Sequence, residues 1–326
     1  MPGAKLKVST LSFSKDAADL TESEAGFQTK DGKLLVLCFH RENKAEFKLL
    51  ETSSGKILRQ YQVFLEMPQI SQPVWLASQD EPIFFMYDLI SCLSYRVVVP
   101  VTQENSSLQV SKAQIVHQDS PSLCYFYGMF VWGRNLLIGS CKTRLDKLWL
   151  IDFDRGCCSC RPFPEGSDAF AGDPAFARVL GDRLYFAPLD NLKRLSWVEL
   201  RPGLSKSHGL CCLTKSCCKN PLPRLRVKKL NCQLNQSLSE CFSTFFDQQN
   251  NWNLLIKTEE NRISWFRLNL KKMSLKKVAT SRECFDEALF PEIVSNEFNC
   301  SQVVGLWAKT DTDLLQHLTK VQLIQD

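Results

Sequence analysis

The segment from His208 to Cys218, HGLCCLTKSCC, is the densest group of side chains in the sequence that could bind a metal ion. Its possible ligands are His208, Cys211, Cys212, Cys217 and Cys218, with Cys232 further on. A structural zinc site needs four such ligands, usually as two close pairs separated by a longer span. No clean second pair follows the first, so we expect no bound metal. A zinc site within residues 208–232 stays an open alternative.

The same part of the chain is strongly basic. Between Glu199 and Glu240 there is no acidic residue. The basic residues of this stretch are Arg201, Lys206, Lys215, Lys219, Arg224, Arg226, Lys228 and Lys229. They carry about +8, whereas the whole chain has a formal net charge of +5, so the remainder is slightly acidic at about −3. We predict that these eight residues bind a partner, the alternative being a solvated insertion whose charges only keep it soluble.

The chemistry of this basic stretch favours an acidic segment of another protein as the partner. Proteins that bind single-stranded nucleic acid usually place aromatic side chains among the cations, so that bases can stack on them. Residues 200–239 contain no Phe, Tyr or Trp. A nucleic-acid-associated factor that uses only backbone contacts is therefore the less favoured alternative.

No linear motif in the sequence points to catalysis. The four histidines are His40, His117, His208 and His317, which are widely spread and lack metal-site spacing. No Gly-rich phosphate loop and no GxSxG motif occurs. Several aspartates fall near predicted turns, where a carboxylate commonly caps backbone amides: Asp152, Asp154, Asp173, Asp182 and Asp190. We expect no enzymatic activity and no cofactor.

Short apolar runs separated by turn signals recur along the chain and would have to position any binding surface. In residues 129–163 the order is MFVW, a turn at Gly133, LLIGS, KLWLIDF, a turn ending at Gly156, and CCSCRPF. Residues 177–203 repeat this order around a turn at Gly181. Further copies begin with GFQTKDGKLLVLCF, PVWLA, CFSTFF and, in shorter form, VVGLWA.

The spacing of these copies predicts an all-β propeller. The bulky positions Phe47, Tyr95, Trp149, Trp197 and Trp265 are 48, 54, 48 and 68 residues apart. This suits four-stranded blades with one enlarged copy, and such sheets bury their faces by stacking around an axis. We predict six blades in one domain over residues 1–326, with a basic Cys-containing insertion at about 201–223. Residues 5–13 would pair with the end of the chain and close the ring. Two stacked β-sandwiches are the alternative.

The segments VLGDRLYFAPL…LSWVEL and VWGRNLLIGS…LWLIDF resemble the turn, second strand and third strand of kelch-type propellers. The resemblance covers roughly residues 26–310. The Gly-Gly doublet of that family is reduced to Gly139-Ser140 in one copy and replaced by Cys38-Phe39 or Ala187-Pro188 in others. The resemblance implies substrate recognition within a larger assembly, such as a ubiquitin ligase or a cytoskeletal or regulatory complex. No F-box-like or BTB-like helical segment precedes the blades, so we expect a separate adaptor.

Together these features predict a non-catalytic protein-interaction module, a scaffold or recruitment subunit that binds through a propeller face. A propeller enzyme with an axial active site is an alternative. No apolar run approaches the roughly 20 residues of a membrane-spanning helix, and no export signal is visible. Most of the fifteen cysteines lie in apolar runs, which fits a reducing compartment. We therefore expect a cytoplasmic or nuclear protein that does not bind membranes.

Overall fold

The account below concerns the residues that the computed structural model describes. The described residues are 5–13, 25–29, 31–41, 43–66, 74–76, 81–102, 106–114, 126–141, 145–154, 156–162, 176–187, 194–200, 225–229, 231–232, 240–246, 251–258, 260–282, 292–294, 302–308 and 316–324. Within these ranges every regular element is a β-strand, and no helix is long and apolar enough to cross a membrane.

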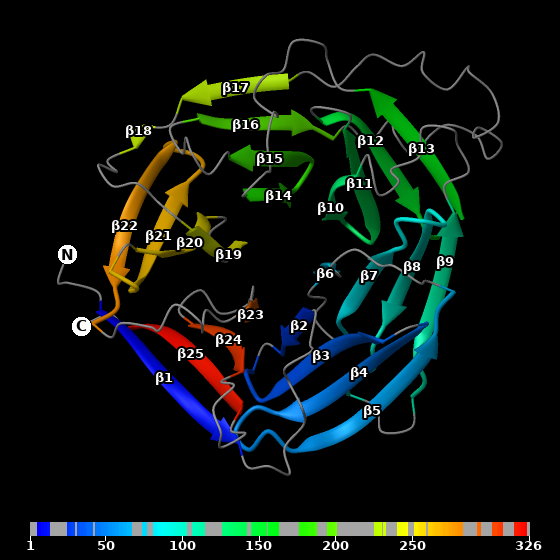
Figure 1. The fold of residues 1–326 in the computed structure, drawn as a ribbon. Helices are drawn as coiled ribbons and strands as arrows, with labels where there is room; N and C mark the ends of the chain where they lie inside the picture. Colours follow the sequence, from blue (N-terminus) through cyan, green and yellow to red (C-terminus); the bar gives the residue numbers. More distant parts are fainter. Residues whose placement is uncertain are drawn as a thin grey trace. The chain divides into compact units, whose positions relative to one another are not determined.

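The described strands form six sheets, of which five have four strands and one has five (Figure 1). The chain divides into two compact units, which are described separately. The first unit comprises Met1–His40, Ala45–Gln62 and Leu230–Asp326, and the second comprises Arg41–Lys44 and Val63–Lys229.

The second unit holds three antiparallel sheets, in each of which neighbouring strands follow one another along the chain. The first sheet contains β6 (Val74–Leu76), β7 (Ile83–Tyr87), β8 (Leu93–Val98) and β9 (Gln109–Gln114). The next contains β10 (Phe126–Trp132), β11 (Asn135–Cys141), β12 (Leu145–Asp152) and β13 (Cys157–Pro162). The third contains β14 (Phe176–Leu180), β15 (Arg183–Ala187), β16 (Arg194–Glu199) and β17 (Leu225–Lys229).

The core of the second unit lies between its successive sheets. One buried cluster joins β7 to β11 and β12, and it includes the tilted ring pair Phe85–Phe153, whose centroids are 5.8 Å apart. A second cluster joins β11 and β12 to β15 and β16 and includes Leu137, Leu184 and Val198. A sheet covered on both faces needs apolar residues at successive positions rather than in alternation. This explains why all five residues of β7 are buried.

The first unit holds the other three sheets. One contains β2 (Ala25–Gln28), β3 (Leu34–Arg41), β4 (Lys44–Glu51) and β5 (Ile57–Phe64). The five-stranded sheet contains β18 (Asn231–Cys232), β19 (Glu240–Phe246), β20 (Asn251–Lys257), β21 (Ile263–Asn269) and β22 (Ser274–Thr280). The last contains β1 (Lys5–Phe13), β23 (Glu292–Val294), β24 (Gln302–Ala308) and β25 (Gln316–Ile324).

The two ends of the described chain share one sheet. β1 pairs antiparallel with β25 over its whole length, from Lys5 opposite Ile324 to Phe13 opposite Gln316. The remaining order of this sheet is β24 and then β23. The pairing that the sequence predicted between residues 5–13 and the end of the chain is therefore confirmed.

The bulky positions aligned in the sequence lie on corresponding strands. Each is on the third strand counted from β2, β6, β10, β14 or β19, and each is at most 6% exposed: Phe47, Tyr95, Trp149, Trp197 and Trp265. Large side chains at this repeated place fill the interior of successive sheets, where burial of apolar area stabilises the fold most.

The end of the basic stretch forms a strand. Residues 225–229, which follow the insertion predicted at about 201–223, form β17, the outer strand of a sheet. β18 follows almost at once and pairs parallel with β22, so that Asn231 lies opposite Ser274. Neither strand has a strong apolar alternation, which is why sequence pattern alone did not identify them.

Glycines make the tight hairpins predicted between β10 and β11 and between β14 and β15. Trp132 pairs with Asn135, which leaves a two-residue loop whose first residue, Gly133, has a φ of 60°. The loop at Gly181 is built in the same way, with a φ of 56°. A positive φ at the first loop position alone is the pattern of a type II′ turn, which matches the twist of the flanking strands.

We expect Gly133→Ala to lower the free energy of unfolding by about 1 kcal/mol, because an L side chain is strained at this φ. A Cβ at this position would meet no atom within 4 Å, so backbone strain is the only cost. Urea denaturation followed by circular dichroism measures the effect. Arg134→Ala, in the same loop at negative φ, is the control and should change stability by less than about half as much. Equal effects would contradict the strain argument.

Candidate functional site

The structure describes three of the eight basic residues predicted to bind a partner. Arg226, Lys228 and Lys229 lie on β17, where they pair with Trp197, Leu195 and Arg194 of β16. The other five lie outside the described residues: Arg201, Lys206, Lys215, Lys219 and Arg224. Of the possible zinc ligands, only Cys232 lies within the described residues, on β18. The partner-binding and zinc interpretations of this stretch therefore stay predictions.

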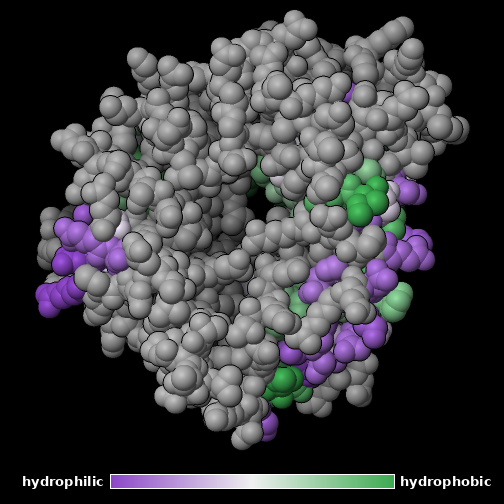
Figure 2. All heavy atoms as spheres, in the orientation of Figure 1, coloured by the Kyte–Doolittle hydropathy of each residue, from purple (hydrophilic) through white to green (hydrophobic). Residues whose placement is uncertain are grey.

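A second cationic surface lies on β22 and the turn before it, and we call it the β22 cationic surface. It consists of Lys271, Lys272, Lys276, Lys277 and Arg282, all of which are exposed. None of the five forms an ion pair within the described residues. Figure 2 shows hydrophilic side chains gathered at the edge of the first unit where β22 lies in Figure 1.

Local backbone geometry presents two of these lysines at the tip of a hairpin. Asn269 pairs with Ser274 at the end of the β21–β22 ladder, and the Asn269 Oδ1 atom accepts a 2.9 Å hydrogen bond from the Lys272 amide. Met273 completes the turn with a φ of 50°. Lys271 and Lys272 therefore project from a capped turn into solvent.

The charge of the β22 cationic surface is visible in the sequence itself. Residues 271–282, KKMSLKKVATSR, hold five basic residues and no acidic residue. The apolar alternation of the same residues predicts a strand of the fifth repeat. Their charge density is comparable to that of the predicted basic stretch.

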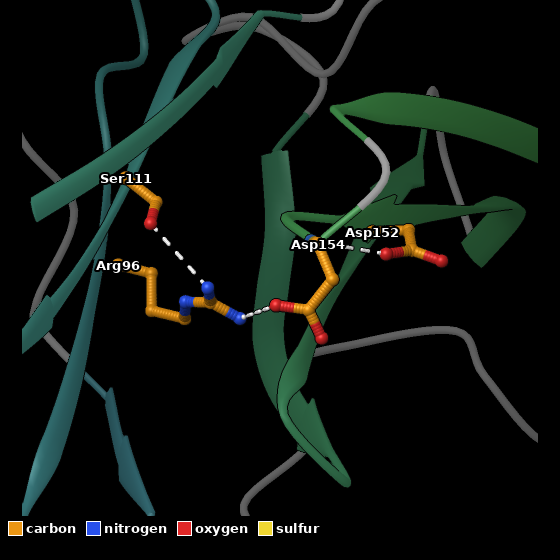
Figure 3. A network of polar contacts seen from close by, with 4 residues as sticks. All are labelled: Arg96, Ser111, Asp152 and Asp154. Atoms are coloured by element: carbon orange, nitrogen blue, oxygen red, sulfur yellow. Dashed lines mark hydrogen bonds and ion pairs between the residues drawn. The ribbon is translucent and has the colours of Figure 1, made fainter.

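Arg96 is a buried cation of the second unit that forms an ion pair between two of its sheets (Figure 3). It lies on β8 with a side chain only 10% exposed, and Nη1 donates a 2.6 Å hydrogen bond to Oδ1 of Asp154, in the turn after β12. Nη2 donates to the Ser111 hydroxyl of β9 at 3.3 Å. The guanidinium carbon lies 5.4 Å from the centroid of the Phe153 ring. The group thus ties two neighbouring sheets together.

Asp154 is held in place for this interaction by its own turn. The Asp154 amide donates to Oδ1 of Asp152 at 3.1 Å, an arrangement that fixes the turn between β12 and β13. The hydrogen bond from Arg96 lowers the pKa of the Asp154 carboxyl below its ordinary value. The sequence analysis expected both aspartates to cap turns, which is confirmed for Asp152 only. The partner of Asp154 lies 58 residues away.

We expect the contribution of Asp154 to stability to depend on pH. Because its pKa is lowered on folding, the stabilisation is present above the ordinary aspartate pKa of 3.8 and is lost as the pH falls through the lower folded value. Thermal unfolding of the wild type and of Asp154→Asn from about pH 7 to about pH 2 measures this. The difference in Tm between them should shrink below about pH 4. A constant difference would contradict the assignment.

Asp88 is the fully buried carboxylate of the described residues, and it also serves the fold. It accepts hydrogen bonds from the amides of Ile90 and Ser91 and from the Ser91 hydroxyl. These bonds fix the tight turn between β7 and β8. Cys92 ends that turn with a φ of 56°. Burial raises the pKa of the neighbouring Tyr87 well above its ordinary range, so its hydroxyl stays protonated.

A polar cluster in the first unit is centred on Asn253, whose side chain is fully buried. Its Oδ1 atom accepts hydrogen bonds from Trp265 Nε1 at 2.9 Å and from Arg267 Nε at 3.1 Å. Its Nδ2 atom donates to the Asn251 carbonyl at 3.1 Å. Buried polar atoms that are satisfied internally stabilise one arrangement of the core.

These clusters join structural elements rather than converge on a reaction site. Within the described part of the chain, no group of three or more His, Cys, Asp and Glu side chains could hold a metal ion. Exposed cations without a described ion pair occur at several places, among them Lys33, Lys56 and Lys112, and they are most densely grouped on β22 and its turn. The described geometry therefore points to surface recognition as the chemistry to consider.

Comparison with known proteins identifies the fold. No protein-family model matches the chain, and no curated protein matches its sequence. The WD40 domain of coronin from Toxoplasma gondii superposes with a TM-score of 0.51 at 9% identity, covering 100% of this chain and 89% of that chain. A luciferin-regenerating enzyme gives a TM-score of 0.50 at 10% identity, covering 97% of this chain and 95% of that chain. At such identities the likeness shows the fold alone, and WD40 domains are β-propellers. The chain thus has the β-propeller fold.

Proposed function

We propose that the protein is a non-catalytic interaction module that recruits another protein through a face of its propeller. The observation that supports this most directly is the contrast between buried and exposed charges. Arg96 and Asp88 are bound by neighbouring groups of the fold, whereas the exposed cations of β22 and its turn form no ion pair within the described residues. A surface that keeps unneutralised charge in water is suited to binding an oppositely charged partner.

The architecture behind this proposal is a single domain of six blades over residues 1–326. The six described sheets and the pairing of β1 with β25 support a ring closed by the two ends of the chain. Within the propellers, the turn and strand pattern of residues 129–163 and 177–203 supports a kelch-like assignment. We place the protein in the cytoplasm or nucleus, as a subunit of a larger complex.

The partner in this proposal is a protein with an acidic segment, and the eight basic residues from Arg201 to Lys229 contact it. The contact would be electrostatic and therefore sensitive to salt. Nucleic acid is the second candidate, because a cationic stretch also attracts phosphates. The lack of aromatic residues in positions 200–239 weighs against it.

Partner capture from cell extract tests this proposal. The full chain and a variant with all eight basic residues replaced by Gln are compared at about 0.1 M and about 0.3 M NaCl. We expect the wild type to retain acidic proteins that the variant loses, with less retention at the higher salt. Treating the extract with nuclease is the control for bridging by RNA or DNA. Loss of all retained proteins after nuclease would overturn the proposal in favour of a nucleic-acid factor.

A further inference from the structure

We propose that the β22 cationic surface is a second binding site, which docks an extended acidic peptide segment of a partner protein. It is separate from the basic stretch of residues 201–229, and the proposal rests on the interaction function proposed above, which it deepens by naming the partner's chemistry at this surface. Its five side chains lie within one hairpin of the first unit and the residues that follow it. These side chains are distinguished by three features: they form no described ion pair, they are spread along the hairpin, and their aromatic and apolar neighbours are buried or partly buried.

The cations of the β22 cationic surface lack neutralising partners among the described residues. Two other cations of the first unit lie beside carboxylates, in Lys48–Glu46 and Arg262–Glu260, both at 3.4 Å. Lys33 and Lys56 are exposed without a described ion pair, but each stands alone, whereas β22 and its turn group five such cations within twelve residues. No described carboxylate pairs with Lys271, Lys272, Lys276, Lys277 or Arg282. The charge of this hairpin is therefore not offset by ion pairs among the residues that the structure describes.

The hairpin formed by β21 and β22 also contains an unfavourable contact between two like charges. Lys276 of β22 lies directly opposite Arg267 of β21 in the antiparallel ladder. Like charges at directly opposite positions destabilise a sheet. Arg267 is anchored to Asn253 through Nε, so the cost falls on the exposed Lys276. An anionic ligand over β22 would remove this repulsion.

The charges of the β22 cationic surface are spread along the chain direction and do not converge on one point. A strand advances about 3.3 Å per residue, so Lys276 and Arg282 are roughly 20 Å apart along the chain direction, with Lys271 and Lys272 beyond the other end. A single phosphate needs several donors converging on one point, which these positions do not provide. An extended chain of carboxylates can follow the line of this hairpin. Because successive side chains of a strand point to opposite faces, Lys276 and Lys277 would contact such a chain from different sides.

The surroundings favour an acidic peptide over nucleic acid or a membrane. The aromatic residues of β21, Trp265 and Phe266, are at most 1% exposed, so they offer no ring on which bases could stack. The apolar residues of β22 are buried or partly buried, as in Leu275 and Val278, so no large apolar side chain is available for insertion into lipid. Electrostatic attraction is the main attraction this surface offers.

The test measures binding of a fluorescein-labelled decaglutamate peptide to the full chain by fluorescence anisotropy. The test variant is K271Q/K272Q/K276Q/K277Q. The matched control is K33Q/K44Q/K56Q/K112Q, which removes four exposed lysines elsewhere. We expect the test variant to bind at least about tenfold more weakly and with a smaller salt dependence, and the control to stay within about twofold of wild type. Equal weakening in both variants would overturn the proposal.

Further measurements distinguish this site from the basic stretch of residues 201–229. They also distinguish an acidic peptide from other anionic ligands. If neutralising the eight residues of 201–229 weakens peptide binding while the β22 variant does not, the inference fails and the proposed function stands. Tighter binding of an oligothymidine or of phosphatidylserine vesicles than of the peptide would also overturn it. Thermal unfolding checks that the variant folds, and we expect its Tm to equal or exceed that of wild type, because the repulsion between Lys276 and Arg267 is removed.

Discussion

Replacing Trp265 by Ala should lower the free energy of unfolding by about 3–5 kcal/mol, the largest effect we expect from any single substitution. Trp265 is fully buried on β21, and its Nε1 atom donates to Asn253 Oδ1 at 2.9 Å. Truncation leaves a cavity where a sheet interior was filled, and it removes one of the two donors to the buried Asn253 oxygen. Urea denaturation followed by circular dichroism measures the loss.

Two further variants separate packing from hydrogen bonding at this position. Trp265→Phe keeps an aromatic ring in the core but loses the donor, so we expect a smaller cost of about 1–2 kcal/mol. Trp132→Ala is the matched control, because Trp132 is partly exposed at the end of β10. Its cost should be less than half that of Trp265→Ala. Equal costs at the two positions would show that the aligned aromatic positions have no special role in the core.

Replacing Asp154 by Ala should cost about 2 kcal/mol, because it leaves the Arg96 guanidinium in a mostly buried place without its counter-ion. The cost is below that of a fully buried pair because the Asp154 side chain is 62% exposed and water screens the interaction. Chemical denaturation of the variant at neutral pH measures it. Because Arg96 and Asp154 come from two neighbouring sheets (Figure 3), a second substitution that removes the Arg96 charge should restore stability.

The rescue is the double variant Arg96→Met/Asp154→Ala. A methionine can pack against the Phe153 ring without bringing a charge into the core, so we expect stability within about 1 kcal/mol of wild type. The control is Glu260→Ala, which removes an exposed partner from Arg262 and should cost less than about 0.5 kcal/mol. If the double variant is less stable than Asp154→Ala alone, the interaction with the aspartate is not the main role of Arg96.

Sequence alone predicted the features that depend on neighbouring residues. A glycine between two apolar runs predicts the turns at Gly133 and Gly181, and the positive φ angles of both glycines agree with that prediction. The aromatic positions such as Trp149 could be aligned because burial on both faces of a sheet leaves a repeated apolar run. These signals are local, so they survive even where the repeats have diverged.

The features that depend on distant residues were not predictable in the same way. Arg96 meets Asp154 only because two sheets pack face to face, and nothing in the residues around either one indicates the partner. The parallel pairing of β18 with β22 depends on the path of the chain between sheets. The β22 cationic surface differs from these two features, because its charge run is visible in residues 271–282 of the sequence itself.

The pairing of β1 with β25 has a consequence for synthesis in the cell. β1 cannot pair with β25 until residues 316–324 have left the ribosome, so it stays without this partner while residues 14–315 are translated. Its nine backbone positions stay available for mispairing throughout that interval. In nascent chains we expect chaperones to bind near residues 5–13, and we expect β1 and β25 to pair more slowly than the local hairpins form.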